Sequence, residues 1–113
     1  MNTNLISFAQ ADALIRSAFK KAADATDNYI KNNGEHPFNC GFAWVVVTGV
    51  RGKKAELLKS HGFEKRCSGP GLMLWNPSKN FTQDMSAKYV GARAFADVLS
   101  EVGFDAYAGE RLD

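Results

Sequence analysis

The sequence predicts an α+β domain in which a long amphipathic helix precedes a β-α-β-β-α-β core. Three observations carry this prediction. The N-terminal part has apolar residues at helical spacing, the rest alternates short apolar runs with helical patterns, and two stretches, "AELLKSHGFE" (55–64) and "ADVLSEVGFD" (96–105), share one helix-ending pattern. A chain of 113 residues, 45% hydrophobic and 23% charged, fits one domain over residues 1–113.

The first two elements are a helix over 7–32 and a strand. Ser7 and Gln10 are placed as a capping box, and "NNG" ends the helix. After the connector "EHPFN", the continuous apolar run "FAWVVV" (42–47) predicts a strand that is buried on both faces and central in its sheet. The predicted helix has apolar residues at helical spacing, namely Phe8, Ala11, Ile15, Ala18, Phe19, Ala22 and Tyr29.

The β-α-β-β-α-β core extends over 41–113. "KKAELLKSH" predicts a short helix that ends at Gly62, and "FEKRC" and "LMLW" flank the turn "SGPG" and predict a hairpin. A third helix covers 85–102, with Asn80 or Thr82 as its N-cap, and ends at Gly103. "DAYAGERL" (105–112) is the last strand.

This order of elements is the split β-α-β pattern of ferredoxin-like sandwiches, with a four-stranded antiparallel sheet. Its first and third strands are central, and here they are the apolar runs, while the second and fourth carry charges that protect an edge. The N-terminal helix is longer than a small sheet. We expect it to cover the open face of the sheet or to serve a homodimer, because Phe8, Ile15, Phe19 and Tyr29 offer more apolar surface than such a sheet needs.

Composition and targeting signals narrow the setting. The net charge of +2 is too small to imply a polyanion partner by itself, although residues 51–66 are mainly basic and residues 84–113 mainly acidic. There is no leader pattern and no apolar run long enough for a membrane span, so we expect a cytoplasmic protein without a membrane partner. Two cysteines cannot form a disulfide framework.

The loop "TGVRGKK" is the most informative candidate site. Its cations crowd a helix start, where the helix dipole disfavours positive charge, and the glycine leaves backbone N–H groups accessible to an anion. It is not a P-loop, because only two residues separate Gly49 from Gly52 and Lys53 is followed by Lys54 rather than by a Ser or Thr. The alternative is a solvated basic surface. The predicted anion or nucleic-acid site consists of Arg51, Gly52, Lys53, Lys54, Lys65 and Arg66.

Aromatic residues on the strands suggest a second binding mode. Phe42, Trp44, Met73 and Trp75 would lie on strands, where an open sheet face can stack on single-stranded bases. The signature of RNA-recognition motifs is absent from "GPGLMLWN". The alternative is that the N-terminal helix or a second subunit buries these side chains.

Metal binding and catalysis have weaker support. His36, Cys40, His61 and Cys67 have the chemistry of metal ligands, but Cys67 ends a strand at the opposite end of the sheet from the others. The same geometry argues against a Cys40–Cys67 disulfide. Cys40 with His61 or His36 as its base remains an alternative, although a single Cys before a buried strand more commonly serves packing. We therefore predict no cofactor, no metal and no catalytic residue.

Two resemblances concern short segments. "LLKSHGFEKRCSGPGLMLW" (57–75) resembles the helix-strand-hairpin of HicA-type RNA-cleaving toxins, whose catalytic histidine lies in a Gly-Ser-His turn. The turn here, residues 68–71, has no histidine, so that activity does not carry over. The helix-Gly-Phe-strand segment is similar to the closing part of GNAT-class acetyltransferases, but their acyl-CoA-binding loop has no match in this chain.

Residues 71–113 resemble the C-terminal part of small uncharacterised proteins of tailed phages. This resemblance implies a host-cytoplasm setting and brings no activity, binding residue or cofactor. The expected function is a small non-enzymatic accessory or interaction protein that forms a homodimer. Binding of nucleic acid or a phosphate ligand through the basic loop is the alternative.

Overall fold

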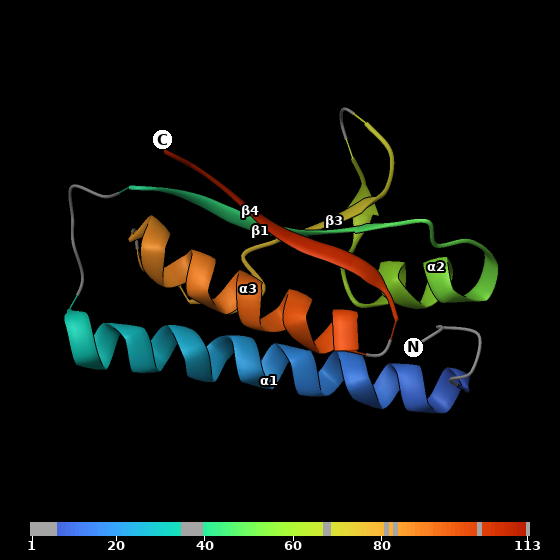
Figure 1. The fold of residues 1–113 in the computed structure, drawn as a ribbon, viewed down its shortest axis with the longest axis horizontal. Helices are drawn as coiled ribbons and strands as arrows, with labels where there is room; N and C mark the ends of the chain where they lie inside the picture. The colour runs from blue at the N-terminus through green and yellow to red at the C-terminus, as the bar shows by residue number, and fades with distance from the viewer. Residues whose placement is uncertain are drawn as a thin grey trace.

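The computed structural model describes residues 7–34, 40–66, 69–80, 82, 84–101 and 103–112, without the side chain of Phe8. Figure 1 shows three layers: the sheet, then α3 with α2 beside it, and α1 packed against α3. This confirms the predicted α+β class with an antiparallel four-stranded sheet. The elements are α1 (Phe8–Asn33), β1 (Gly41–Thr48), α2 (Gly52–Ser60), β2 (Glu64–Lys65), β3 (Leu72–Trp75), α3 (Met85–Glu101) and β4 (Asp105–Leu112).

The sheet has the strand order β2-β3-β1-β4, and every neighbouring pair is antiparallel. β1 and β3 are therefore central and β2 and β4 lie at the edges, as the apolar and charged runs predicted. Val46 marks the middle of the sheet, since it lies opposite Met73 on β3 and Tyr107 on β4. This register decides which side chains share a face.

β1 is buried on both faces only over part of its length, which partly corrects the expectation from its continuous apolar run. Ala43, Val45 and Val47 face the helices and are buried. On the opposite face Phe42 is 39% exposed and Trp44 is half-buried, whereas Val46, the register partner of Met73 and Tyr107, is fully buried. The reason is that α2 and α3 both pack on one face of the sheet, and α1 lies behind α3 rather than over the other face.

The contact between α1 and α3 explains the position of the long helix. Small residues let the two helices approach closely, and the Thr26 hydroxyl donates a hydrogen bond of 2.7 Å to the carbonyl of Ala87. A Cβ atom on Gly91 would lie only 2.4 Å from the Thr26 Oγ1 atom. Ile15 is fully buried on the same stripe of α1. Of the residues that suggested a dimer, Ile15 and Phe19 thus pack inside the chain, while the side chain of Phe8 lies outside the described residues.

Both ends of α1 agree with the sequence. Ser7 and Gln10 form the predicted capping box, since the Ser7 side chain accepts from the Gln10 N–H and the Gln10 side chain accepts from the Ser7 N–H. The backbone N–H of Gly34 donates to the Ile30 carbonyl and closes the last turn. The predicted range, 7–32, is within one residue of the observed one at each end.

The repeated Gly-Phe ending is the same hydrogen-bonded corner built twice. Each glycine has a positive φ, 105° at Gly62 and 98° at Gly103, and each following phenylalanine is buried. This is the Schellman arrangement, in which two backbone N–H groups satisfy the last helical carbonyls. The bonds run from Gly62 to Lys59, from Phe63 to Leu58, from Gly103 to Ser100 and from Phe104 to Leu99.

The start of α3 differs from the prediction. Neither Asn80 nor Thr82 caps the helix; Asp84, directly before it, accepts from the Ser86 N–H at 3.0 Å. The two predicted residues instead organise the approach, since Asn80 accepts from the Thr82 N–H and Thr82 from the Asp84 N–H. Asn80, Thr82 and Asp84 are similar polar residues at alternate positions, and the sequence analysis considered only the first two as caps.

None of the described helices combines the length and apolar character that crossing a membrane requires.

Candidate functional site

The face of the sheet that the helices leave uncovered carries a cluster of aromatic side chains. We call Phe42, Trp44, Trp75 and Tyr107 the aromatic face. Trp75 is 48% exposed and Tyr107 46% exposed. Such large rings are normally buried, so their exposure on one continuous surface is informative. The N-terminal helix, one of the two covers expected for these side chains, packs on α3 instead.

The rings are held in a fixed arrangement by strand register. Trp44 lies opposite Trp75 across β1 and β3, and their ring centroids are 5.2 Å apart. Phe42 meets Trp75 edge-on, with centroids 6.0 Å apart and an angle of 83° between the planes. Trp75 therefore contacts both neighbours, which reduces the conformational entropy that a ligand would have to remove.

Gly109 on β4 leaves the space that the Trp44 indole ring occupies. The two residues are register partners, and a Cβ atom on Gly109 would lie 2.6 Å from the indole ring. The indole therefore lies across the β4 backbone in space that any other residue would occupy. This glycine is a steric requirement, and its φ is not among the positive values.

Two cations border the aromatic face at the Phe42 end. The Lys88 ammonium donates to the Gly41 carbonyl at 2.9 Å and lies 5.8 Å from the Phe42 ring centroid. The Arg111 guanidinium lies 6.0 Å from the same ring. Both contacts are within the range of cation–π attraction. Around them is a groove of about 400 Å³, lined by Phe42, Ala43, Trp75, Asn76, Lys88 and Arg111.

A third cation lies at the other end of the open face. Arg66 donates to the Pro70 carbonyl at 3.2 Å and to the Tyr107 hydroxyl at 3.3 Å. The acidic groups nearby are the exposed Glu64 and Asp105, which accepts from the Thr48 hydroxyl at 2.8 Å. Cations thus lie at both ends of the open face.

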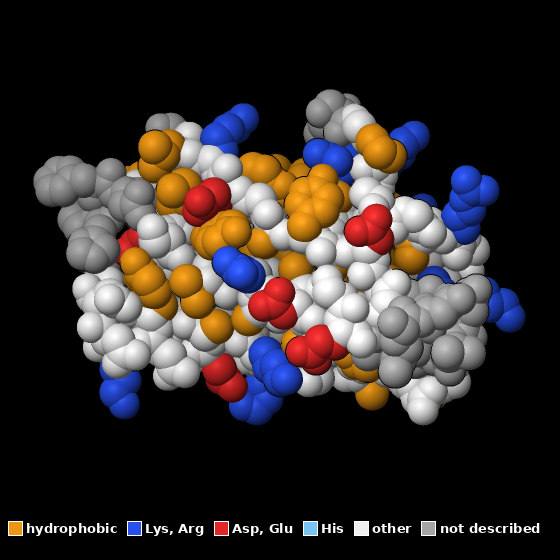
Figure 2. Space-filling model, in the orientation of Figure 1, with side chains coloured by type: hydrophobic (Ala, Val, Ile, Leu, Met, Phe, Trp, Pro, Cys, Tyr) orange, Lys and Arg blue, Asp and Glu red, His pale blue; other side chains and the backbone are white. Residues whose placement is uncertain are grey.

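Hydrophobic side chains also gather over the strands when the molecule is seen from the side of β4. Figure 2 shows them in orange over the sheet layer, with basic side chains around the upper rim.

The predicted basic site is divided between two places. Arg51, Gly52 and Lys53 are exposed at the start of α2, where no side chain caps the helix. Lys54 is half-buried there. Lys65 is the last residue of β2 and Arg66 follows it, on the hairpin that pairs β2 with β3. Arg66 is directed across the open face toward Tyr107, so its guanidinium is engaged on that face.

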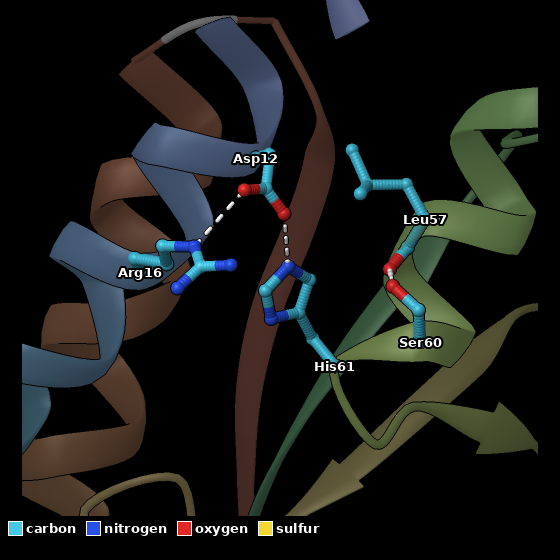
Figure 3. A network of polar contacts seen from close by, with 5 residues as sticks. All are labelled: Asp12, Arg16, Leu57, Ser60 and His61. Carbon is cyan, nitrogen blue, oxygen red and sulfur yellow. Dashed lines mark hydrogen bonds and ion pairs between the residues drawn. The ribbon is translucent and has the colours of Figure 1, made fainter. Parts of the chain in front are cut away.

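A second polar cluster joins α1 to the end of α2. Asp12 lies between Arg16, at 2.9 Å, and the His61 Nε2 atom, at 2.6 Å, as Figure 3 shows. The hydrogen bond from His61, and then that from Arg16, lowers the pKa of Asp12 below its ordinary value of 3.8. The ionised carboxylate can only accept, so Nε2 of His61 carries the proton.

This cluster does not have the arrangement of a hydrolytic triad. Ser60 is adjacent to His61 in sequence, but its hydroxyl donates to the Leu57 carbonyl at 2.6 Å and points away from the imidazole, as Figure 3 shows. A nucleophile must lie within hydrogen-bond reach of its base. We therefore assign the contact between Asp12 and His61 a structural role, which is to connect α1 to the end of α2.

The candidate metal ligands are not brought together among the described residues. His36 and Cys67 lie outside the described residues, Cys40 is half-buried in a β-bridge with Asp84, and His61 is bound to Asp12. Within the part of the chain that the structure describes, no three His, Cys, Asp or Glu side chains are placed to hold a metal ion.

Sequence reasoning identified Phe42, Trp44 and Trp75 but missed Tyr107 and Lys88. Tyr107, Gly109 and Arg111 alternate along the last strand, and that period of two could have placed them on the open face beside β1. Nothing in the sequence brings Lys88, on α3, to the Gly41 carbonyl, because this contact depends on how α3 lies under the sheet.

The chain matches no protein-family model, no curated protein and no solved structure.

Proposed function

We propose that this protein is a non-enzymatic binding protein whose aromatic face takes single-stranded nucleic acid. One observation carries the proposal: Phe42, Trp44 and Trp75 form a contiguous aromatic surface that the chain's own helices leave open, with the Lys88 ammonium fixed beside it. Bases stack on exposed aromatic rings whatever their sequence, and cations in a groove bind the phosphates between them.

The arrangement suits an extended strand better than a duplex. Phe42, Trp75 and Tyr107 present rings on a surface, where unstacked bases can reach them, whereas paired bases hide their faces inside the helix. The cations offer phosphate contacts at both ends, through Lys88 and Arg111 at one and Arg66 at the other. We expect binding that tolerates sequence and weakens with salt.

We further propose that the sheet is that of a ferredoxin-like sandwich, with its open face serving as the binding surface and α1 added behind α3. The strand order β4-β1-β3-β2, with β1 and β3 central, supports this proposal. The phage origin remains a prediction from the resemblance of residues 71–113. The cytoplasmic location remains a prediction from the absence of a leader pattern and of a membrane-length apolar run, and the homodimer remains a prediction as well.

The basic loop remains a second candidate for phosphate binding. Arg51 and Lys53 are exposed at the positive end of α2, and no side chain caps that helix start. Neither cation belongs to the aromatic face, so phosphate binding at this helix start would be independent of that face.

Matched charge deletions distinguish the two sites. We expect Phe42→Ala or Trp75→Ala to weaken binding of a labelled oligothymidylate by about 5- to 150-fold, since one stacked base contributes about 1–3 kcal/mol. Lys88→Met should reduce the log–log salt slope by about 0.7, the value for one single-strand phosphate, and Lys53→Met should leave the slope unchanged. Fluorescence anisotropy across a salt series gives both quantities.

The reverse pattern, in which Lys53→Met weakens binding and Phe42→Ala does not, would move the site to the basic loop. No retention of the unmodified protein on single-stranded nucleic acid at about 50 mM salt would refute both versions.

A further inference from the structure

The outer edge of β4 is a second surface, distinct from the aromatic face. All eight residues of β4 pair with β1, and no described strand pairs with its other side. The strand contains no proline, the residue that most directly blocks edge pairing. In Figure 1 β4 crosses in front of the other strands, so its edge faces the viewer.

The register identifies which backbone groups face outward. The Asn76 N–H donates to the Ala43 carbonyl, so Ala43 directs its backbone toward β3 and Trp44 directs its own toward β4. Trp44 is the partner of Gly109, and the alternation then directs the even-numbered residues of β4 away from β1. The Ser100 hydroxyl donates to the carbonyl of Ala106, in agreement with this assignment.

The alternation limits how a second copy could pair with this edge. In an antiparallel β4–β4 pair, outward-facing residues must lie opposite outward-facing residues, so Ala108 opposite Ala108 is allowed and Ala108 opposite Gly109 is not. With Ala108 on the two-fold axis, Asp105 of each copy lies opposite Arg111 of the other. A register shifted by two residues in one direction would place Tyr107 of each copy opposite Arg111 of the other. A shift of four residues in that direction would place Glu110 of one copy opposite Glu110 of the other.

The same register covers an exposed apolar side chain. Leu112, 61% exposed, would lie at the level of Phe104 in the other copy. On α3, which packs under β4, both Arg93 and Asp97 are exposed. Two copies that meet along β4 would therefore not bring surfaces of like charge together. Figure 2 shows basic and acidic side chains next to one another over the helices on this side.

We propose that two copies of this chain pair antiparallel along β4, with Ala108 on the two-fold axis. The product is a continuous eight-stranded sheet in which Asp105 and Arg111 form two symmetric interchain ion pairs. The two aromatic faces then lie on the same side of one sheet. The pairing uses backbone groups and does not depend on what the aromatic faces bind.

Charge exchange tests the register. Asp105→Arg and Arg111→Asp each create two like-charge contacts and should weaken the dimer at least about tenfold, whereas the variant with both substitutions should recover it. Sedimentation equilibrium up to about 0.5 mM protein measures the dissociation constant. Circular dichroism melting checks that each variant folds, because Asp105 also binds Thr48. Arg111 lines the groove, so mass is the readout and nucleic-acid binding is not.

A disulfide trap gives a second measurement in a Cys40→Ser, Cys67→Ser background. Asp105→Cys with Arg111→Cys should yield an oxidised covalent dimer, since the two positions are about 20 Å apart within one strand and can bridge only between copies. Tyr107→Cys with Arg111→Cys, matched to the register shifted by two residues, should not crosslink. A monomer at every concentration, or a dimer with no crosslink and no response to the charge variants, would overturn the proposal.

Discussion

Gly91→Ala tests the packing of α1 on α3, which leaves the aromatic face uncovered. At an exposed helical position this change stabilises a protein by about 1 kcal/mol, because alanine is the better helix former. Here the new Cβ atom would lie 2.4 Å from Thr26 Oγ1 and 2.9 Å from the Ala22 carbonyl oxygen, which is backbone and cannot rotate away. The gain in helix propensity therefore competes with steric overlap.

The overlap should win. Overpacking costs about 1–3 kcal/mol, and displacing the Thr26 hydroxyl from the Ala87 carbonyl at this buried site adds about 1–3 kcal/mol. We expect a net destabilisation of about 1–5 kcal/mol and a fall in Tm of at least about 4 °C. Urea and thermal unfolding followed by circular dichroism measure it.

Two comparisons make the result specific. Arg93→Ala, at an exposed position of the same helix, should stay within about 0.5 kcal/mol of the unmodified protein. Thr26→Ala combined with Gly91→Ala should be less destabilising than the two single changes together, because removing Oγ1 makes room for the new methyl group. A stability gain for Gly91→Ala alone would show that α1 does not pack on α3 in this way.

The remaining predictions concern the contact between Asp12 and His61 and the two Gly-Phe helix endings. Asp12→Asn should destabilise the protein near pH 7. Because the Asp12 pKa is lowered on folding, the stability that its carboxylate contributes is present above pH 3.8 and is lost as the pH falls below that value. Urea titrations at acidic pH should therefore give the same free energy of unfolding for the variant and the unmodified protein. A constant difference at all pH values would contradict this. Gly62→Ala and Gly103→Ala should each cost about 1–2 kcal/mol, since both positions need a positive φ, and an unchanged urea midpoint in either would contradict the Schellman corner there.

The sequence predicted local structure well where one residue type had one physical reason. Gly62 and Gly103 were recognisable because only glycine adopts a positive φ at little cost, and the following phenylalanines marked where the chain turns back. The apolar and charged runs also placed β1 and β3 in the centre of the sheet. These signals depend on neighbours in the chain.

What the sequence did not predict depends on contacts between distant segments. The apolar stripe of α1 showed that the helix packs on something, but only the small residues Ala87 and Gly91, matched to Thr26, make α3 that partner. His61 and Asp12 are 49 residues apart, so no local pattern could pair them. The continuous apolar run of β1 was misleading, because Phe42 and Trp44 look the same whether a surface is buried or binds a ligand.

Intrinsic fluorescence tests the central claim most directly. The chain has two tryptophans, Trp44 and Trp75, and both belong to the aromatic face, so their emission reports on this surface alone. Titration with unlabelled oligothymidylate at about 50 mM salt should quench the emission to saturation, and added salt should reverse the quenching. The same strand annealed to its complement should quench much less. Unchanged emission at saturating oligonucleotide would contradict the account, even if the protein were retained on nucleic acid by other means.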